Sequence, residues 1–268
     1  MSAIVDFDEK TARAVEAMYL TPDVVAQRGQ VLSMMNPRPG EAALDIGVGP
    51  GLLAYDLARM VGDDGRVVGV DVSPAMLTLA RTRLAALPQA DVVEADATAL
   101  GLESEAFDLA VSTQVYEYVA DMAGALKELH RVLRPGGRAL ILDTDWDSVV
   151  WHSNDHDRMT RVLACWDAHL VDPHLPATLG GKLQAAGFEV QRCEIIPMLS
   201  ASYQPYSYGA GIMRGIHGFV RGVVRAGGEG HGLSPEEVQA WYDDQMGLIE
   251  RGGFFFSVNR YAFVARRS

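Results

Sequence analysis

The sequence predicts an α/β protein built on a doubly wound, mostly parallel β-sheet. Short apolar runs rich in β-branched residues alternate with segments whose apolar residues recur at helical spacing, which is typical of a parallel sheet with helices on both faces. The first such run, residues 42–46, leads into a glycine cluster at residues 47–51, as in sheets that bind a ligand at their strand ends. With 268 residues, of which 49% are hydrophobic, the chain is long enough to bury the core of one large domain.

The predicted elements follow one another in a regular order. Helices are expected over residues 8–19 and 22–35, and a proline-rich break at residues 37–40 ends the second. Ser73 caps a further helix that starts at Pro74, since a serine oxygen accepts from the first turn and proline suits the first helical position. Besides residues 42–46, the expected strands are residues 66–71, 91–94, 107–112, 138–143, 188–197 and 254–265. The expected helices among them are residues 52–60, 74–87, 122–133, 155–169 and 179–186.

The length between the last two expected strands predicts an inserted helical cap. Two helical segments, residues 208–226 and 235–251, are separated by a glycine-rich stretch. We therefore expect a single domain over residues 1–268. Its parts are N-terminal helices at residues 1–36, a core at 37–199, the cap at 200–252 and the last strand at 253–268.

Charge and composition exclude several classes of function. The 23 Lys plus Arg against 35 Asp plus Glu give a net charge of −12, which disfavours a nucleic-acid partner. The two cysteines, Cys165 and Cys193, lie far apart and indicate neither a disulfide framework nor a thiolate metal cluster. The first ten residues are acidic where a signal peptide would be basic, and no apolar run reaches the length of a membrane span. We expect a cytoplasmic protein without an integral membrane segment, either a monomer or a homodimer.

The glycine cluster is the most informative segment. Gly47, Gly49 and Gly51 let the backbone approach a ligand where a side chain would clash. A dinucleotide site would place its third glycine at position 52, where this chain has Leu52. Asp45 precedes the first glycine by two residues, and an anion there does not favour a pyrophosphate. The loop is therefore expected to bind a ligand with a cationic group, and a nicotinamide dehydrogenase is disfavoured.

Two further aspartates follow neighbouring strands. Asp71 ends the second expected strand, where its carboxylate can accept from both ribose hydroxyls of a nucleoside that lies across the strand ends. Asp96 and Ala97 follow the third strand and would reach the adenine edge by the same geometry. The alternative is that both aspartates only cap turns.

Taken together, these segments resemble a known enzyme family. The motifs are LDIGVGPG at residues 44–51, VD at 70–71, EADA at 94–97, FDL at 107–109 and ELHRVLRPGG at 128–137. They are similar, in order, to those of class I S-adenosylmethionine-dependent methyltransferases, and most similar to the branch that includes ubiquinone and menaquinone C-methyltransferases. The resemblance covers roughly residues 20–200. It implies a Rossmann-like, seven-stranded sheet with a reversed last hairpin.

The resemblance also implies a cofactor, S-adenosyl-L-methionine, and its pocket. The glycines would face the methionine portion, Asp71 the ribose, and Asp96 with Ala97 the adenine. In family members with a comparable arrangement, the N-terminal helices fold over the cofactor, so that Arg28 would pair with the cofactor's carboxylate; the alternative is a solvated arginine. The implied cofactor-binding residues are Tyr19, Arg28, Asp45, Gly47, Gly49, Gly51, Asp71, Val72, Met76, Asp96, Ala97, Ser112 and Gln114.

Methyl transfer from a sulfonium is an in-line displacement, so most of the catalysis can come from positioning the acceptor. A base is needed only if the acceptor must lose a proton. Candidates follow the fourth and fifth strands: Tyr116, Asp143 and, preferred for acceptor contact or proton removal, His152. Tyr118 stands where the resembling branch often carries histidine, so this sequence departs there.

A metal site is the alternative use of these residues. His152 and His156 with Asp145 or Asp147 would offer ligands, but no third ligand is fixed by the sequence, so no metal is predicted. Alternatively, these polar residues only cap the start of a helix at the protein surface.

The cap is expected to select the acceptor. Its first helix carries a broad apolar stripe, for which we favour a packed lid with a solvated basic face over contact with an apolar substrate or a membrane. Tyr203, Tyr206 and Tyr208 favour a small aromatic or prenyl-like acceptor. A thiophilic acceptor such as arsenic is disfavoured because the cysteines are distant. A protein of this fold that catalyses a non-methylating reaction such as cyclisation, or binds the cofactor without turnover, stays open.

Overall fold

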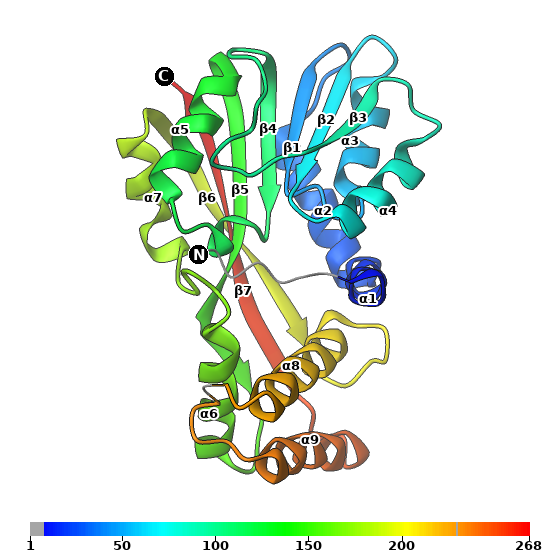
Figure 1. The fold of residues 1–268 in the computed structure, drawn as a ribbon, viewed down its shortest axis with the longest axis vertical. Helices are drawn as coiled ribbons and strands as arrows, with labels where there is room; N and C mark the ends of the chain where they lie inside the picture. The colour runs from blue at the N-terminus through cyan, green and yellow to red at the C-terminus, as the bar shows by residue number, and fades with distance from the viewer. Residues whose placement is uncertain (1–7, 229) are drawn as a thin grey trace.

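The computed structural model describes residues 8–228 and 230–268 of the chain. Its strands form a seven-stranded sheet in the order β3-β2-β1-β4-β5-β7-β6 (Figure 1). Strand β7 is antiparallel to both β5 and β6, and the other neighbouring pairs are parallel. The strands are β1 (Ala42–Ile46), β2 (Arg66–Asp71), β3 (Ala90–Glu94), β4 (Phe107–Thr113), β5 (Leu133–Trp151), β6 (Phe188–Ser200) and β7 (Phe256–Arg267). The predicted doubly wound, mostly parallel sheet is confirmed.

Six of the described α-helices begin after a residue whose side chain accepts from a backbone N–H group of the first turn. Asp8 accepts from the N–H of Thr11 at 2.7 Å, and Ser73 caps the helix that Pro74 opens. The helices are α1 (Glu9–Tyr19), α2 (Pro22–Met35), α3 (Leu52–Val61), α4 (Pro74–Leu84), α5 (Met122–Val132), α6 (His156–Asp167), α7 (Pro176–Ala185), α8 (Tyr208–Arg225) and α9 (Pro235–Glu250), with a short 3-10 turn η1 (Tyr116–Tyr118). Of the first ten residues, which are acidic where a signal peptide would be basic, residues 1–7 lie outside the described part.

Both faces of the sheet are covered by helices. Successive residues of β1 point to opposite faces: Leu44 joins the buried cluster under α5 and α7, whereas Ala43 joins the cluster formed with α2, α3 and α4. Asp45, two residues after Ala43, lies on the same side as α3. The alternation therefore places the acidic side chain at the strand end next to the glycine loop.

Strand β5 is much longer than the sequence predicted. We expected it to end at Asp143, but it continues to Trp151 and pairs with β7 beyond an irregularity after Asp145. Trp151 packs edge-on against Trp241 and Phe256, with ring centroids 5.6 and 4.8 Å apart. The extension is stabilised by a hydrophobic cluster outside the main sheet, which a local apolar pattern does not reveal.

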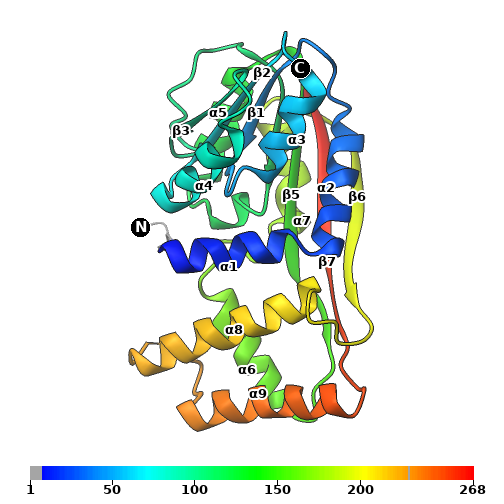
Figure 2. The ribbon, with the colours of Figure 1, turned by 90° about the vertical axis from the view of Figure 1, so that its right-hand side faces the viewer.

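That cluster joins α6, α8 and α9 to the extended ends of β5 and β7. These helices lie beyond one end of the sheet, and α1 runs across the boundary between sheet and cap (Figure 2). In α8, Ile212, Met213, Ile216 and Val220 are buried in the cluster, whereas the arginines of α8 face solvent. This packing agrees with a lid whose basic face is solvated. Within the described residues no helix is both long and apolar enough to cross a membrane.

Candidate active site

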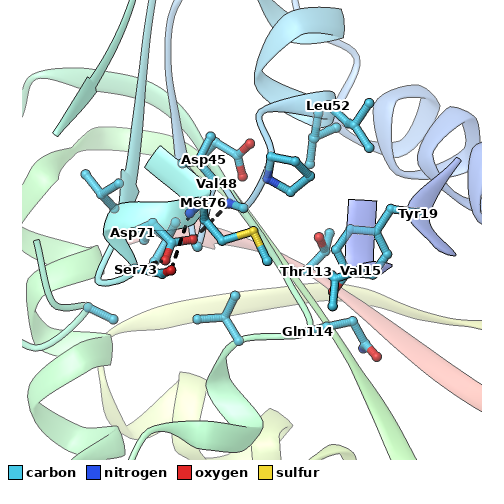
Figure 3. Close-up of a pocket in the computed structure, with 18 of the residues that line it drawn as sticks. Val15, Tyr19, Asp45, Val48, Leu52, Asp71, Ser73, Met76, Thr113 and Gln114 are labelled. Carbon is cyan, nitrogen blue, oxygen red and sulfur yellow. Dashed lines mark hydrogen bonds between the residues drawn. The ribbon is translucent and has the colours of Figure 1, made fainter. Parts of the chain in front are cut away.

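A pocket lies over the carboxyl ends of β1, β2 and β4 and is covered by α1 and α2 (Figure 3). It brings together most of the residues that the sequence assigned to a cofactor. Those in its lining are Tyr19, Arg28, Asp45, Gly47, Gly49, Asp71, Val72, Met76, Asp96, Ala97 and Gln114. The pocket thus lies where parallel sheets ordinarily bind their ligands.

The glycine loop has a backbone that only glycine adopts without strain. Gly47 has φ +73°, and a Cβ there would lie 2.1 Å from Cγ2 of Val115. Gly51 has φ +79° but packs against Ala80 of α4 rather than lining the pocket. Gly51 has no side chain because α4 lies too close to it to leave room for one, and not because a ligand contacts it.

Asp71 ties the loop to the end of β2. Its carboxylate accepts from the N–H groups of Gly49 and Ser73, each at 2.9 Å. Burial raises the pKa of Asp71, and these backbone donors oppose that rise by stabilising the ionised form. These two bonds hold the glycine loop against the end of β2. Each carboxylate oxygen still has a lone pair that can accept from a hydroxyl group of a ligand, so Asp71 can serve both roles.

Asp45 is the least satisfied acid of the pocket. Its side chain is 2% exposed, and its Oδ2 has no hydrogen-bond partner among the described residues. Burial, and then the nearby Asp71, raise the pKa of Asp45 to about 7. An acid so placed gains from a cationic partner, which agrees with the ligand that the loop was expected to bind.

The pKa of Asp45 predicts a pH-dependent affinity for a ligand that carries an ammonium group. Between pH 6.0 and 7.5 the ionised fraction of an acid with a pKa of about 7 rises roughly eightfold. S-adenosylhomocysteine should therefore bind about eightfold more tightly at pH 7.5 than at pH 6.0, by calorimetry, if only ionised Asp45 binds it well. In Asp45→Asn the affinity should be nearly flat over this range. The same slope in both proteins would contradict the role of Asp45.

Asp96 both lines the pocket and caps a turn. Its Oδ1 accepts from the N–H of Thr98 at 2.8 Å and from the Thr98 hydroxyl at 2.6 Å. The side chain is exposed, whereas the neighbouring Ala97 is buried. The turn-capping alternative therefore holds for Asp96 without removing it from the pocket.

Tyr19 and Arg28, on the two N-terminal helices, both line the pocket. Burial raises the pKa of Tyr19 to about 12, so its phenol stays neutral. Arg28 forms an ion pair with Asp56, Nε to Oδ2 at 2.7 Å, and its Nη1 donates to the carbonyl oxygen of Tyr19 at 3.4 Å. Its charge is already balanced, which weakens the expectation that it holds a carboxylate.

Of the residues at the end of β4, some line the pocket and others are buried in the core. Ser112 is 2% exposed and lies outside the lining, whereas Thr113 and Gln114 belong to it. Gln114 adopts φ +59° and accepts from the hydroxyl of Thr144 at 2.6 Å. In Figure 3, Met76 points from the side of Asp71 toward Thr113.

The structure places none of the three expected catalytic residues in the lining. Tyr116 and Asp143 are fully buried, and Asp143 accepts from the N–H of Val115 at 2.9 Å. His152 follows the end of β5 next to α9 of the cap, and its Nδ1 lies 2.7 Å from the carbonyl oxygen of Gly253. The long β5 carries His152 past the pocket, so its location corrects the expectation that it lies at the mouth of the cleft.

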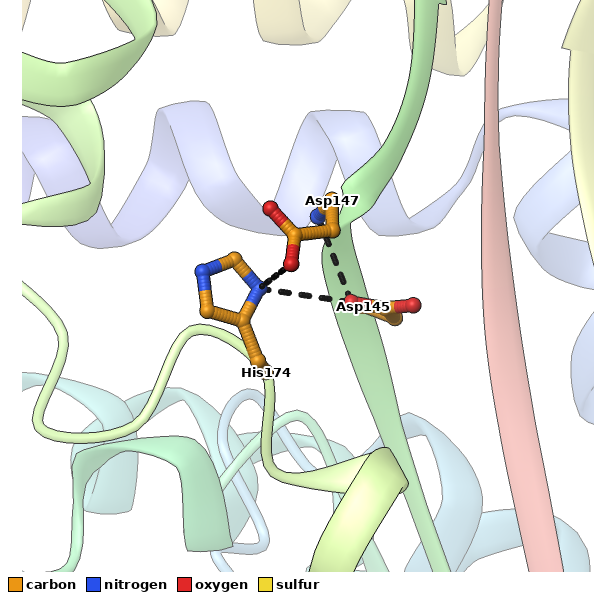
Figure 4. Close-up of side chains that lie close together, drawn as sticks. All are labelled: Asp145, Asp147 and His174. Carbon is orange, nitrogen blue, oxygen red and sulfur yellow. Dashed lines mark hydrogen bonds and ion pairs between the residues drawn. The ribbon is translucent and has the colours of Figure 1, made fainter.

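Asp145 and Asp147 do meet a histidine, but not one that the sequence paired with them. Nδ1 of His174 lies 3.4 Å from Asp145 and 3.3 Å from Asp147 (Figure 4). The side chain of Asp147 is 78% exposed, and exposed acidic groups of this kind are common in proteins without a metal ion. Neither His152 nor His156 belongs to this group.

Sequence reasoning missed one charged residue of the pocket, Arg260. It lies on β7, is 1% exposed and lines the pocket. Phe256, Val258 and Ala262, at alternate positions of the same strand, are also buried. A charged residue at a core-facing position of an alternating strand is the signal that could have found it.

The comparisons with known proteins agree with this geometry. Residues 44–141 match the family model described as a methyltransferase domain. An uncharacterised 37.1 kDa protein of a transposon from Streptomyces fradiae is 34% identical over 257 residues, which cover 94% of this chain and 70% of that protein. A demethylmenaquinone methyltransferase from Staphylococcus epidermidis is 37% identical over 117 residues, 44% of this chain and 48% of that enzyme. The match thus spans about half of that enzyme.

A solved structure shares the fold. The cyclase SpnF superposes with a TM-score of 0.58 and 22% identity, over 91% of this chain and 80% of that one. Together with the family model and the pocket, the sequence relatives show that this chain belongs to the class I S-adenosylmethionine-dependent methyltransferases. It is an enzyme of that class, and S-adenosylmethionine is its cofactor.

The residues present fit this cofactor. The backbone of Gly47 and Gly49 lines the pocket, where a Cβ at Gly47 would collide with Val115 of the same lining. The unpartnered oxygen of Asp45 offers a place for a positive charge. Asp71 offers two oxygens at the end of β2 for the ribose hydroxyls. When bound, S-adenosylmethionine supplies a methyl group on a positively charged sulfur.

Proposed function

We propose that this enzyme methylates a small aromatic or apolar molecule by in-line displacement. The observation that carries the proposal is the composition of one continuous pocket. Asp45 and Asp71 lie at its cofactor end, and apolar and aromatic side chains line much of the rest, including Val15, Tyr19 and Tyr118. Such walls exclude water and favour a flat, apolar acceptor over a polar metabolite. The likeness to a demethylmenaquinone methyltransferase supports a quinone-like acceptor.

The chain's own residues would contribute mainly by positioning. The glycine loop and Asp71 hold the cofactor end, while Thr113 and Gln114 lie between that end and the aromatic walls. Residues of helices α1 and α2 line the pocket and would keep water from the reacting atoms. Orientation at near-attack distance can supply several kcal/mol of barrier reduction, about 7–11 kcal/mol at best.

We also propose the finer points that follow from the sequence. The chain would act as a single domain, in the cytoplasm, as a monomer or a homodimer, and on a free small molecule. Its net charge of −12 supports the absence of a nucleic-acid partner. None of these points depends on the identity of the acceptor.

The test is formation of S-adenosylhomocysteine that depends on an acceptor. We expect turnover with 1,4-naphthohydroquinone, a small quinone-like probe, and none with the polar probe phosphoethanolamine. Mass spectrometry of the probe should show a gain of one methyl group. Turnover with phosphoethanolamine alone would contradict the proposed acceptor class.

The same assay separates methyl transfer from the alternative use of the fold. The shared fold with the cyclase SpnF shows that the architecture alone does not define the reaction. Tight binding of S-adenosylmethionine, without S-adenosylhomocysteine formation across a panel of aromatic probes, would favour a non-methylating reaction or binding alone.

A further inference from the structure

Arg260 is a buried cation without an ion pair. Its residue is 1% exposed, and among residues 8–228 and 230–268 no ion pair joins its guanidinium to a carboxylate. Nη1 donates to Oε1 of Gln27, and the guanidinium carbon lies 4.5 Å from the centre of the Tyr208 ring. Nε has no partner within the same residues. A buried charge held only by neutral groups is costly, which indicates a missing anion.

The acids near Arg260 do not provide that anion. Burial raises the pKa of Glu117 to about 8 and raises the pKa of Asp143 well above its ordinary value, although the positive charge of Arg260 opposes both rises. Neither acid forms an ion pair with the guanidinium. Asp23 lies near Tyr208 but accepts from two backbone N–H groups, those of Val24 at 3.1 Å and Tyr208 at 2.7 Å. Within the described part of the chain, no acid forms an ion pair with this guanidinium, which lines the pocket.

The place of Arg260 in the sheet puts it on the acceptor side. Arg260 pairs with Thr144 of β5, whereas Asp71 ends β2. These strands are four positions apart in the order β2-β1-β4-β5-β7, about 19 Å at the usual strand spacing. The ribose end and the guanidinium thus lie at opposite sides of one pocket, with the glycine loop and Gln114 between them.

We propose that Arg260 binds an anionic oxygen of the acceptor, so that the enzyme selects aromatic molecules that carry a carboxylate, phenolate or enolate group. The inference rests on the proposed function and specifies its substrate class. The Nε–H of Arg260, which has no partner among the described residues, can donate a charge-assisted hydrogen bond to such an oxygen. The negative end of the pocket receives the cationic cofactor, and the positive end receives the anionic acceptor.

The probes 2-naphthoate and 2-naphthamide test this proposal, because they have the same size and differ in charge. Each is titrated by calorimetry into enzyme saturated with S-adenosylhomocysteine. The wild type should bind naphthoate at least about tenfold more tightly than naphthamide, the usual advantage of a charge-assisted hydrogen bond. Arg260→Gln should bring the ratio close to one, and Arg260→Lys should retain part of it. Arg266→Gln, an exposed arginine on the same strand, is the matched control and should leave the ratio unchanged.

A second pair of ligands separates the acceptor from the cofactor as the source of the anion. S-adenosylhomocysteine carries a carboxylate that 5′-methylthioadenosine lacks. The ratio of their affinities should be the same in Arg260→Gln as in the wild type. A fall in this ratio would assign the guanidinium to the carboxylate of the cofactor and overturn the acceptor assignment.

The remaining outcomes also decide the matter. If the wild type binds both naphthyl probes equally, or neither, the proposal is wrong whatever the variants do, so it stays testable even if Arg260→Gln does not fold. If Arg260→Gln melts earlier but keeps the preference for naphthoate, Arg260 is only structural. Failure of the wild type to bind S-adenosylhomocysteine would instead count against the proposed function.

Discussion

Replacing Asp71 with alanine is expected to weaken the binding of S-adenosylhomocysteine by about 1–3 kcal/mol, or roughly 5- to 150-fold. Two losses add up in this variant. The ribose hydroxyls lose their acceptor, and the N–H groups of Gly49 and Ser73 lose the carboxylate that holds the loop against β2. Calorimetry measures the affinity, and thermal unfolding shows whether the fold survives.

Asp63→Ala is the matched control for Asp71→Ala. Asp63 is an exposed aspartate in the turn before β2, so the same substitution there should change the affinity by less than about twofold. An unchanged affinity in Asp71→Ala would remove Asp71 from the ribose. A large loss of affinity in both variants would indicate an effect of the overall negative charge and not a contact between Asp71 and the ribose.

Substituting Gly47 by alanine should have the second large effect, on affinity and on stability together. The left-handed backbone at φ +73° costs an L-residue about 1–2 kcal/mol. The new Cβ would also lie 2.1 Å from Cγ2 of Val115, so either the Val115 side chain or the glycine loop must shift. We expect a melting temperature several degrees lower and a loss of cofactor affinity of at least about tenfold.

Two further variants test the cause. Val115→Ala added to Gly47→Ala removes the clash but not the backbone strain, so it should restore only part of the melting temperature. Gly181→Ala places the same extra carbon in α7, where no atom lies within 4 Å, and should raise stability by about 0.5–1 kcal/mol. A harmless Gly47→Ala would show that the loop tolerates a side chain and that its tight geometry is not required.

The parts of this fold that depend on local pattern could be predicted from the sequence. The alternation of apolar runs gave the strands from β1 to β4 within about one residue, because parallel strands buried on both faces are continuous apolar runs. Asp45, Gly47 and Asp71 could be placed in one pocket because parallel strands end at the same edge of a sheet.

The parts that depend on long-range packing could not. Strand β5 extends to Trp151 because that residue packs against Trp241 and Phe256, which lie about a hundred residues further along the chain. That extension moved His152 away from the pocket, and a loop 29 residues after Asp145 brought His174 to that acid instead. Arg260 was not predicted as a pocket residue. Its neighbours in the pocket, Gln27 of α2 and Tyr208 of α8, lie far from it in the sequence, and no spacing pattern connects them.

The place of β7 between β5 and β6 has a consequence for biosynthesis. The ribosome makes its 12 residues last among the strands of this sheet. These residues nevertheless pair with both neighbouring strands, and they supply Phe256 and Val258, which pack against the cap, and Arg260 of the pocket. Until these residues emerge, β5 and β6 are open edges that can pair with other chains. A chain that stops before residue 256 would therefore lack part of the pocket and would be prone to aggregate. Only a chain with all seven strands can bind the cofactor and the acceptor in a complete pocket.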